Sequence, residues 1–185
     1  MKASPTTFII TFLSVFIMAV SACAPIDEIG PPPCPQATTL DDASHLIRFH
    51  KGAGRDLIDV DFEAEIVKLQ GSCEYLIDED TGTGTLLMEA SVRFKLVRGP
   101  ANRTRKAAFD YFVSIVDHTG QIVQKQLFPF EIDFSNNRMQ LRKEDAPVEL
   151  IYPIDTSFRD DDINIFIGIQ LTREELDYIR NSLHH

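Results

Sequence analysis

Strict alternation of apolar and polar residues constrains this 185-residue chain more than any other feature. Apolar side chains recur at every second position from Ile163 to Leu171 and again from Leu86 to Leu96. A period of two places successive side chains on opposite faces of an extended strand, so that one face can be buried. Both segments are therefore predicted to be half-buried β-strands.

Shorter alternating segments recur along the chain, and turn-forming residues separate them. They begin near Val60, Phe109, Ile122, Phe130 and Val148, with turn signals at 81–84, 117–120 and 136–137. Strands joined by tight turns pair antiparallel, and seven or eight short strands are typical of a two-sheet sandwich. We therefore predict an all-β fold over residues 34–171, an antiparallel immunoglobulin-like two-sheet sandwich.

Helical signals are confined to two places. Residues 172–175, Thr-Arg-Glu-Glu, form a capping box, and an apolar stripe of Leu176, Ile179 and Leu183 follows. Residues 172–183 are therefore expected to form a short C-terminal α-helix that packs on the sandwich. The segment 40–49 fits either a short helix or an edge strand.

The N-terminal segment has the pattern of a secretory signal. Lys2 precedes an apolar run from Phe8 to Val20, which is short for a membrane span of roughly 20 residues. Residues 20–23, Val-Ser-Ala-Cys, resemble the lipobox of bacterial lipoproteins, in which the cysteine is acylated and the signal is cut before it. The resemblance implies a signal peptide over 1–22 and a lipid on Cys23. A plain signal peptide with an unmodified Cys23 and an uncleaved anchor are the alternatives.

The next residues are expected to link the lipid to the folded domain. Residues 23–33 include three consecutive prolines, which favour an extended, semi-stiff tether. With Cys23 acylated, Cys34 and Cys73 are the remaining thiols, and an even pair in an oxidising compartment usually forms a disulfide. A redox or metal-binding pair is the alternative, but neither cysteine belongs to a Cys-x-x-Cys motif or lies beside a histidine cluster.

Composition and motifs exclude several function classes. The chain has 28 acidic against 18 basic side chains and a pI near 4.9, which argues against nucleic acid as a partner. The sequence contains no Gly-x-Ser-x-Gly motif, no phosphate-binding loop and no set of metal ligands at recognisable spacing. The acidic run 160–162 has no EF-hand spacing, so a solvated turn is favoured over calcium binding. We predict no catalytic residues, no metal and no cofactor.

A basic stretch is the most distinctive candidate for a contact surface. Six positive charges without an intervening acid lie between 93 and 106, at Arg93, Lys95, Arg98, Arg103, Arg105 and Lys106. Segregated charge of this kind produces a local positive field on an acidic chain. It indicates contact with lipid headgroups, lipopolysaccharide phosphates or an acidic protein face. Internal balance against neighbouring acidic strands is the other interpretation, and both remain open.

The whole chain also resembles a group of small, uncharacterised proteobacterial lipoproteins. The similar features are the lipobox at 20–23, the Cys-Pro start at 34–37, and the stretches 54–64, 98–101 and 168–180. This resemblance implies a location and a single immunoglobulin-like or fibronectin III-like domain, without an activity. Ala24, rather than Asp, follows the lipidated cysteine, which favours the outer over the inner membrane in enterobacterial sorting.

These features together predict a non-enzymatic lipoprotein that faces the periplasm. Its membrane contact is the N-terminal lipid, and its partner is an unknown envelope protein, for which it acts as an adaptor or accessory subunit. Strand edges and the 93–106 stretch are the expected contact surfaces. The alternative is a small-ligand or lipid-binding module, which needs an apolar pocket between the sheets. An enzyme of unfamiliar type is a third hypothesis.

Overall fold

The computed structural model of the chain describes residues 32–52 and 54–183. The predicted signal peptide, Cys23 and most of the predicted tether lie outside the described residues. Within the described part, no helix combines the length and the apolarity that crossing a membrane requires.

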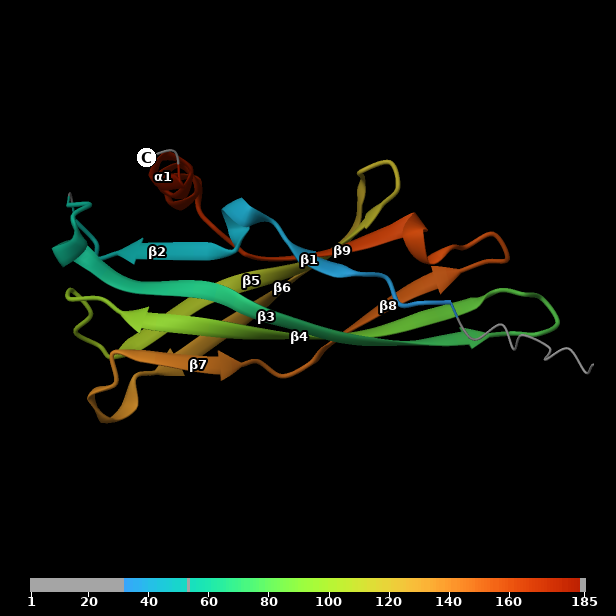
Figure 1. Cartoon of the computed structure of the whole chain (residues 1–185), viewed down its shortest axis with the longest axis horizontal. Helices are drawn as coiled ribbons and strands as arrows, with labels where there is room; N and C mark the ends of the chain where they lie inside the picture. The colour runs from blue at the N-terminus through green and yellow to red at the C-terminus, as the bar shows by residue number, and fades with distance from the viewer. Residues whose placement is uncertain (1–31, 53, 184–185) are drawn as a thin grey trace, which may run out of the picture. The chain divides into compact units, whose positions relative to one another are not determined.

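Two β-sheets make up the fold (Figure 1). The β5 sheet has the order β1-β9-β5-β6, formed by Ala37–Thr39, Ile163–Ile169, Lys106–Asp117 and Ile122–Asp133. The β4 sheet has the order β2-β3-β4, formed by His45–Phe49, Val60–Ile77 and Gly84–Arg98, with β7 (Gln140–Glu144) and β8 (Val148–Ile154) both paired to β4. Short 3-10 turns are η1 (Asp41–Ala43), η2 (Leu57–Asp59), η3 (Ser135–Asn137) and η4 (Asp160–Asp162), and α1 (Arg173–Leu183) follows β9.

The strand order is that of an immunoglobulin-type sandwich. In that fold strands A, B and E lie side by side in one sheet, and G, F, C and C′ in the other. Strands β3, β4 and β7/β8 take the places of A, B and E, and β9, β5 and β6 those of F, C and C′. Strand β1 takes the place of G, but it runs parallel to β9. The predicted all-β, immunoglobulin-like two-sheet sandwich with a C-terminal helix is confirmed.

The alternating side chains fill the space between the sheets. All six apolar positions from Leu86 to Leu96 are buried, as are four in β9, Ile163, Ile165, Ile167 and Ile169. Phe94 lies at the centre, where its ring packs within about 5 Å of three aromatic rings, those of Phe109, Tyr111 and Phe130. Aromatic pairs in such edge-on and tilted geometries add to the free energy of apolar burial.

Two boundaries differ from the sequence-based expectation. Residues 122–128 and 130–134 were predicted as separate strands, but β6 runs continuously through Pro129 to Asp133. The hydrogen-bonded pairs with β5 fall on the residues flanking Pro129, so its position points away from β5 and needs no N–H donor. The ambiguous segment 40–49 forms the 3-10 turn η1 followed by the edge strand β2.

One buried phenol makes the stability of the sandwich depend on pH. The hydroxyl of Tyr111, which is fully buried, donates a hydrogen bond of 2.8 Å to Asp145 Oδ2. Burial, then this hydrogen bond and the negative charge of Asp145, raise the pKa of Tyr111 well above its usual value of 10.0. The neutral phenol therefore stabilises the folded state fully below about pH 10, and this contribution is lost as the pH rises further because the unfolded chain ionises first.

Replacing Tyr111 by Phe is expected to remove this alkaline sensitivity. Between about pH 10 and pH 12, the free energy of unfolding of the wild type should fall more steeply than that of Tyr111→Phe, by up to about 1.4 kcal/mol per pH unit. At neutral pH the substitution should cost about 1–2 kcal/mol because a hydrogen bond to a carboxylate is lost. Urea titrations at stepwise pH measure both effects, and parallel pH profiles would contradict the assignment.

Candidate functional site: an arginine loop at one end of the sandwich

Three of the six cations between residues 93 and 106 are paired within the domain. Arg93 Nε donates to Glu144 Oε2, Lys95 Nζ to Glu65 Oε2 and Lys106 Nζ to Glu131 Oε1, each at 2.9 Å. The hydrogen bond from Lys95 lowers the pKa of Glu65, and that to Glu131 raises the pKa of Lys106. These three charges balance acidic residues on neighbouring strands.

The other three cations have no carboxylate within ion-pair distance among the described residues. Arg98 is partly buried, and its Nη2 donates to the backbone oxygen of Asn102 at 2.8 Å, while its buried Nε has no hydrogen-bond partner. Arg103 and Arg105 are exposed in the loop that joins β4 to β5. Among the described residues of the 93–106 stretch, the exposed cations that have no carboxylate partner therefore all lie in this loop.

Asn102 holds the loop in one conformation. Its side chain is 1% exposed. Oδ1 accepts the N–H of Arg105 at 2.7 Å and Nδ2 donates to the oxygen of Lys106 at 2.8 Å. Arg105 lies in the left-handed region with φ 60°, a conformation that these two bonds maintain. A loop with its polar groups satisfied in this way presents its charged side chains at little cost in conformational entropy.

The base of the loop is fastened to β3. Gly99 N–H donates to the oxygen of Asp61, and Ala101 N–H donates to the oxygen of Val60. The two backbones approach so closely at Gly99 that a Cβ there would lie 2.0 Å from the oxygen of Val60. The residue at this position must therefore be glycine for the loop to dock.

Two further segments reach the same end of the sandwich. Phe134 N–H donates to the oxygen of Arg105, and Arg98 N–H donates to that of Met139, so the β6–β7 connection lies against the loop. The 3-10 turn η2 directly precedes Val60, to which the loop is bound. Together these segments display three exposed apolar residues, Leu57 (81% exposed), Ile58 (73%) and Met139 (55%). They also display Arg138, which like Arg103 and Arg105 is exposed and has no carboxylate partner among the described residues.

We call this set the arginine end: Leu57, Ile58, Arg103, Arg105, Arg138 and Met139. Sequence reasoning found two of these residues and missed four. The contacts that unite them join segments about 30 to 40 positions apart, and no local pattern reports such contacts. The one available signal was the pair of adjacent apolar residues Leu57 and Ile58 between two aspartates, outside any alternating run.

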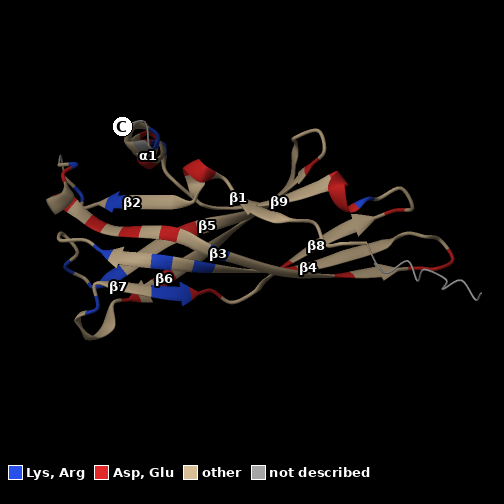
Figure 2. Ribbon diagram, in the orientation of Figure 1, with Lys and Arg blue, Asp and Glu red and all other residues tan. Residues whose placement is uncertain are grey.

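The opposite end of the strands is acidic (Figure 2). The connections β3–β4, β5–β6 and β8–β9 carry Asp78, Glu79, Asp80, Asp117, Asp155, Asp160, Asp161 and Asp162. Asp78, Asp117 and Asp155 accept hydrogen bonds within their own turns, and these bonds lower their pKa values. No group of three or more His, Cys, Asp or Glu side chains in the described part of the chain is arranged to hold a metal ion. This end of the strands therefore carries a cluster of negative charge.

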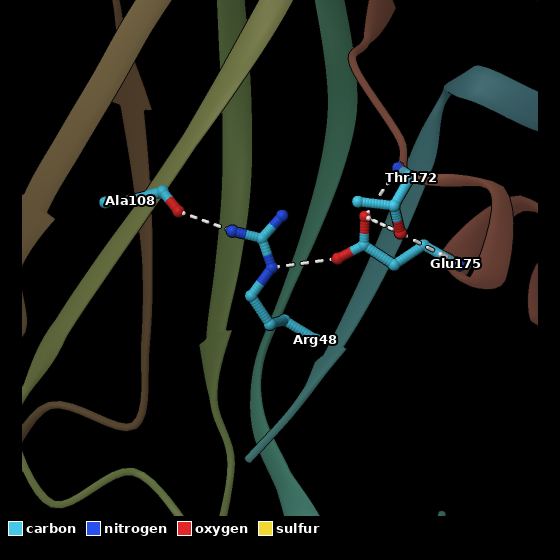
Figure 3. A network of polar contacts seen from close by, with 4 residues as sticks. All are labelled: Arg48, Ala108, Thr172 and Glu175. Carbon is cyan, nitrogen blue, oxygen red and sulfur yellow. Dashed lines mark hydrogen bonds and ion pairs between the residues drawn. The ribbon is translucent and has the colours of Figure 1, made fainter. Parts of the chain in front are cut away.

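Arg48, another arginine, binds α1 to the sandwich (Figure 3). Arg48 on β2 donates from Nε to Glu175 Oε1 and from Nη1 to the oxygen of Ala108 on β5, both at 2.9 Å. Glu175 also closes the predicted capping box, because its Oε2 accepts the N–H of Thr172 at 2.8 Å. Arg48 therefore joins both sheets to the helix, and its charge is balanced internally.

The two remaining cysteines form the predicted disulfide. Cys34 and Cys73 are bonded, with their Cα atoms 5.7 Å apart. The bond ties the segment before β1 to the C-terminal third of β3 and removes both thiols from redox chemistry. At a rise of about 3.3 Å per residue, Cys73 lies about 40 Å along β3 from Val60 and hence from the arginine end.

Comparison with known proteins does not place the chain in a family. No protein-family model matches the sequence, and no curated protein matches it. Among solved structures, the variable (V) domain of the AgI/II polypeptide BspA from Streptococcus agalactiae is similar, with 12% identity over 74% of this chain and 78% of that chain and a TM-score of 0.19. The fold is accordingly defined by its own strand order.

Proposed function

We propose that this chain is a non-enzymatic, lipid-anchored envelope protein whose sandwich is an adaptor that holds a partner protein by its arginine end. The observation that carries the proposal is the pair Arg103 and Arg105, exposed on a loop fixed by the buried Asn102 and without carboxylate partners in the described part of the chain. Planar guanidinium groups bind carboxylates with two parallel hydrogen bonds, which suits an acidic protein face.

The position of the arginine end favours a protein over the anchoring membrane. The resemblance of residues 20–23 to a lipobox supports a lipid on Cys23, and the chain would then enter the domain at Cys34. The disulfide holds that entry point about 40 Å along β3 from the arginine end. The arginine end therefore lies away from the point where the chain enters the domain, and Leu57, Ile58 and Met139 supply apolar contact area beside the arginines.

A matched pair of triple variants tests this function. Arg103→Gln, Arg105→Gln and Arg138→Gln together should reduce the partner recovered by cross-linking in cells about tenfold or more, because charge pairs in an interface typically contribute over 1.4 kcal/mol. The control, Lys68→Gln, Arg142→Gln and Lys143→Gln, removes three exposed cations on β3 and β7 that have no ion pair within residues 32–52 and 54–183, and it should leave recovery unchanged.

The same experiment identifies the partner and tests the anchor. Partners are quantified by mass spectrometry after cross-linking, membrane solubilisation and purification of the full-length protein. Equal recovery from both triple variants would show that the arginine end is not the contact surface. The mass of the N-terminal peptide reports acylation of Cys23 independently, and a Cys23→Ser variant should leave the membrane fraction.

A further inference from the structure

Strand β6 has an open edge in the described structure. It pairs with β5 on one side, and no described strand pairs with its other side. Phe134 N–H donates to the oxygen of Arg105, and the register continues through the pair Tyr111–Phe128. Because bonded pairs alternate in an antiparallel ladder, the amides of Lys125 and Leu127 point away from β5.

The open edge is short and has defined limits. A register shift between Ile115 and Val116 on β5 marks one end, opposite Ile122 and Val123. Pro129 closes the other end, since it occupies an outward position and has no N–H to donate. We call residues 122–128 the β6 window. Three of its apolar side chains are exposed, those of Ile122 (62%), Val123 (48%) and Leu127 (55%).

Lys125, the cation in the β6 window, does not extend over the open edge of β6. Edge strands are commonly protected from pairing by lysines that extend over them. Here the Lys125 ammonium lies 4.4 Å from the centroid of the Phe112 ring and donates to Gln170 Oε1 at 2.9 Å. It is thus folded across β5 and β9, and no carboxylate lies within ion-pair distance of it among the described residues.

We propose that the β6 window binds an extended segment of a partner protein by strand addition, and that this segment carries an acidic residue between two apolar ones. The outward amides of Lys125 and Leu127 supply the main-chain hydrogen bonds. An acidic side chain directly opposite Lys125 comes within reach of its ammonium when the lysine turns from Phe112 and Gln170 toward the open edge, because facing Cβ atoms across an antiparallel pair are about 5 Å apart. Apolar side chains two positions to either side cover Val123 and Leu127.

A second copy of the chain is a poorer occupant. Residues 122–130 contain no Asp or Glu, so pairing of two β6 strands never brings a carboxylate to Lys125. The chain also has a net charge of −10, so two copies repel each other. A heterologous acidic segment satisfies Lys125 and covers the same apolar side chains.

A synthetic peptide serves as the probe, with the sequence Ser-Thr-Val-Thr-Glu-Thr-Val-Thr-Ser and a fluorescent label. Binding to the full-length protein in detergent is measured by anisotropy. Replacing the central Glu by Lys should weaken binding by roughly tenfold, and N-methylation of the peptide amides that face β6 should abolish it. Equal affinities of the N-methylated and unmodified peptides, or no binding of the unmodified peptide, would overturn the proposal.

Two substitutions at one position separate backbone from side-chain recognition. Leu127→Pro removes an outward N–H without breaking a bond to β5, as Pro129 already shows is tolerated, and should abolish binding. Leu127→Thr keeps the amide and should weaken binding only a few-fold, roughly the effect of losing one exposed apolar contact. Urea titrations establish that both variants fold, and equal binding by the two would overturn strand addition.

Two controls separate this inference from the other possibilities. The triple variant of Arg103, Arg105 and Arg138 should bind the peptide like the wild type, so that failure of the proposed adaptor function and failure of the β6 window are distinguishable. Sedimentation that shows a peptide-independent dimer, lost in Leu127→Pro, would replace the partner segment by a second copy of the chain and overturn the proposal.

Discussion

Replacing Cys34 and Cys73 together by alanine should lower the free energy of unfolding by about 3–4 kcal/mol. The bond spans 39 positions, and removing it restores the conformational entropy of that loop to the unfolded chain. Strand β1 depends most on the bond, because it has only three residues and pairs with a single neighbour. Its pairing with β9 should therefore open before the rest of the sandwich unfolds.

Denaturant titrations with and without reductant measure this effect. Reductant should destabilise the wild type by about the same amount and leave the double variant unchanged, since no other cysteine lies within the sandwich. In the double variant, amide hydrogen exchange should be faster where β1 pairs with β9, at residues 37–39 and 165–167. An unchanged denaturation midpoint would mean that β1 is held by its packing alone.

Replacing Asn102 by Ala should both destabilise the domain and release the partner, although no charge is removed. The substitution leaves the N–H of Arg105 and the oxygen of Lys106 without their partners in a partly buried position, which costs about 1–3 kcal/mol. Without these bonds the left-handed conformation of Arg105 is no longer favoured, so the arginines lose their fixed placement. Recovery of cross-linked partner should fall as far as in the arginine triple variant.

Asn102→Asp separates the two hydrogen bonds of Asn102. The carboxylate can still accept the N–H of Arg105, but it cannot donate to the oxygen of Lys106. Because this buried carboxylate would face the oxygen of Lys106, the variant should lose at least as much stability as the alanine variant, yet retain part of the partner recovery through the bond from Arg105. A stable Asn102→Ala protein with full recovery would show that the charges act without the loop's fixed conformation.

Strand content could be predicted from the sequence because alternation needs no knowledge of the neighbouring strand. The faces of β4 and β9 follow from period two alone. Strand β1 could not be predicted, because three residues, Ala-Thr-Thr, carry no readable pattern and are held by β9 and the disulfide. The continuation of β6 through Pro129 could not be predicted either. A proline fits there because its backbone nitrogen faces away from β5, and the sequence does not reveal on which side of β6 the neighbouring strand lies.

The candidate site was predictable only in part, because the sequence does not reveal which residues face each other across neighbouring strands. Charge segregation drew attention to 93–106, but cross-strand register decides which cations remain unpaired. Arg93 lies opposite Glu144, and Lys95 lies opposite Glu65, so both are neutralised by residues distant in the sequence. Within the 93–106 stretch, Arg98 at the end of β4 and the loop residues Arg103 and Arg105 lack such neighbours among the described residues.

The parallel pairing of β1 with β9 imposes an order in time on folding. Strand β1 is synthesised first, but it cannot pair until β9, the last strand, has been synthesised, because Ala37–Thr39 pairs with residues 165–167. Contacts so distant along the chain form slowly, since a long loop must close first. Cys73 emerges far earlier than β9, so oxidation can hold the β1 segment beside β3 while the remainder of the chain arrives. The disulfide would thus position the β1 segment during folding as well as stabilise the folded domain afterwards.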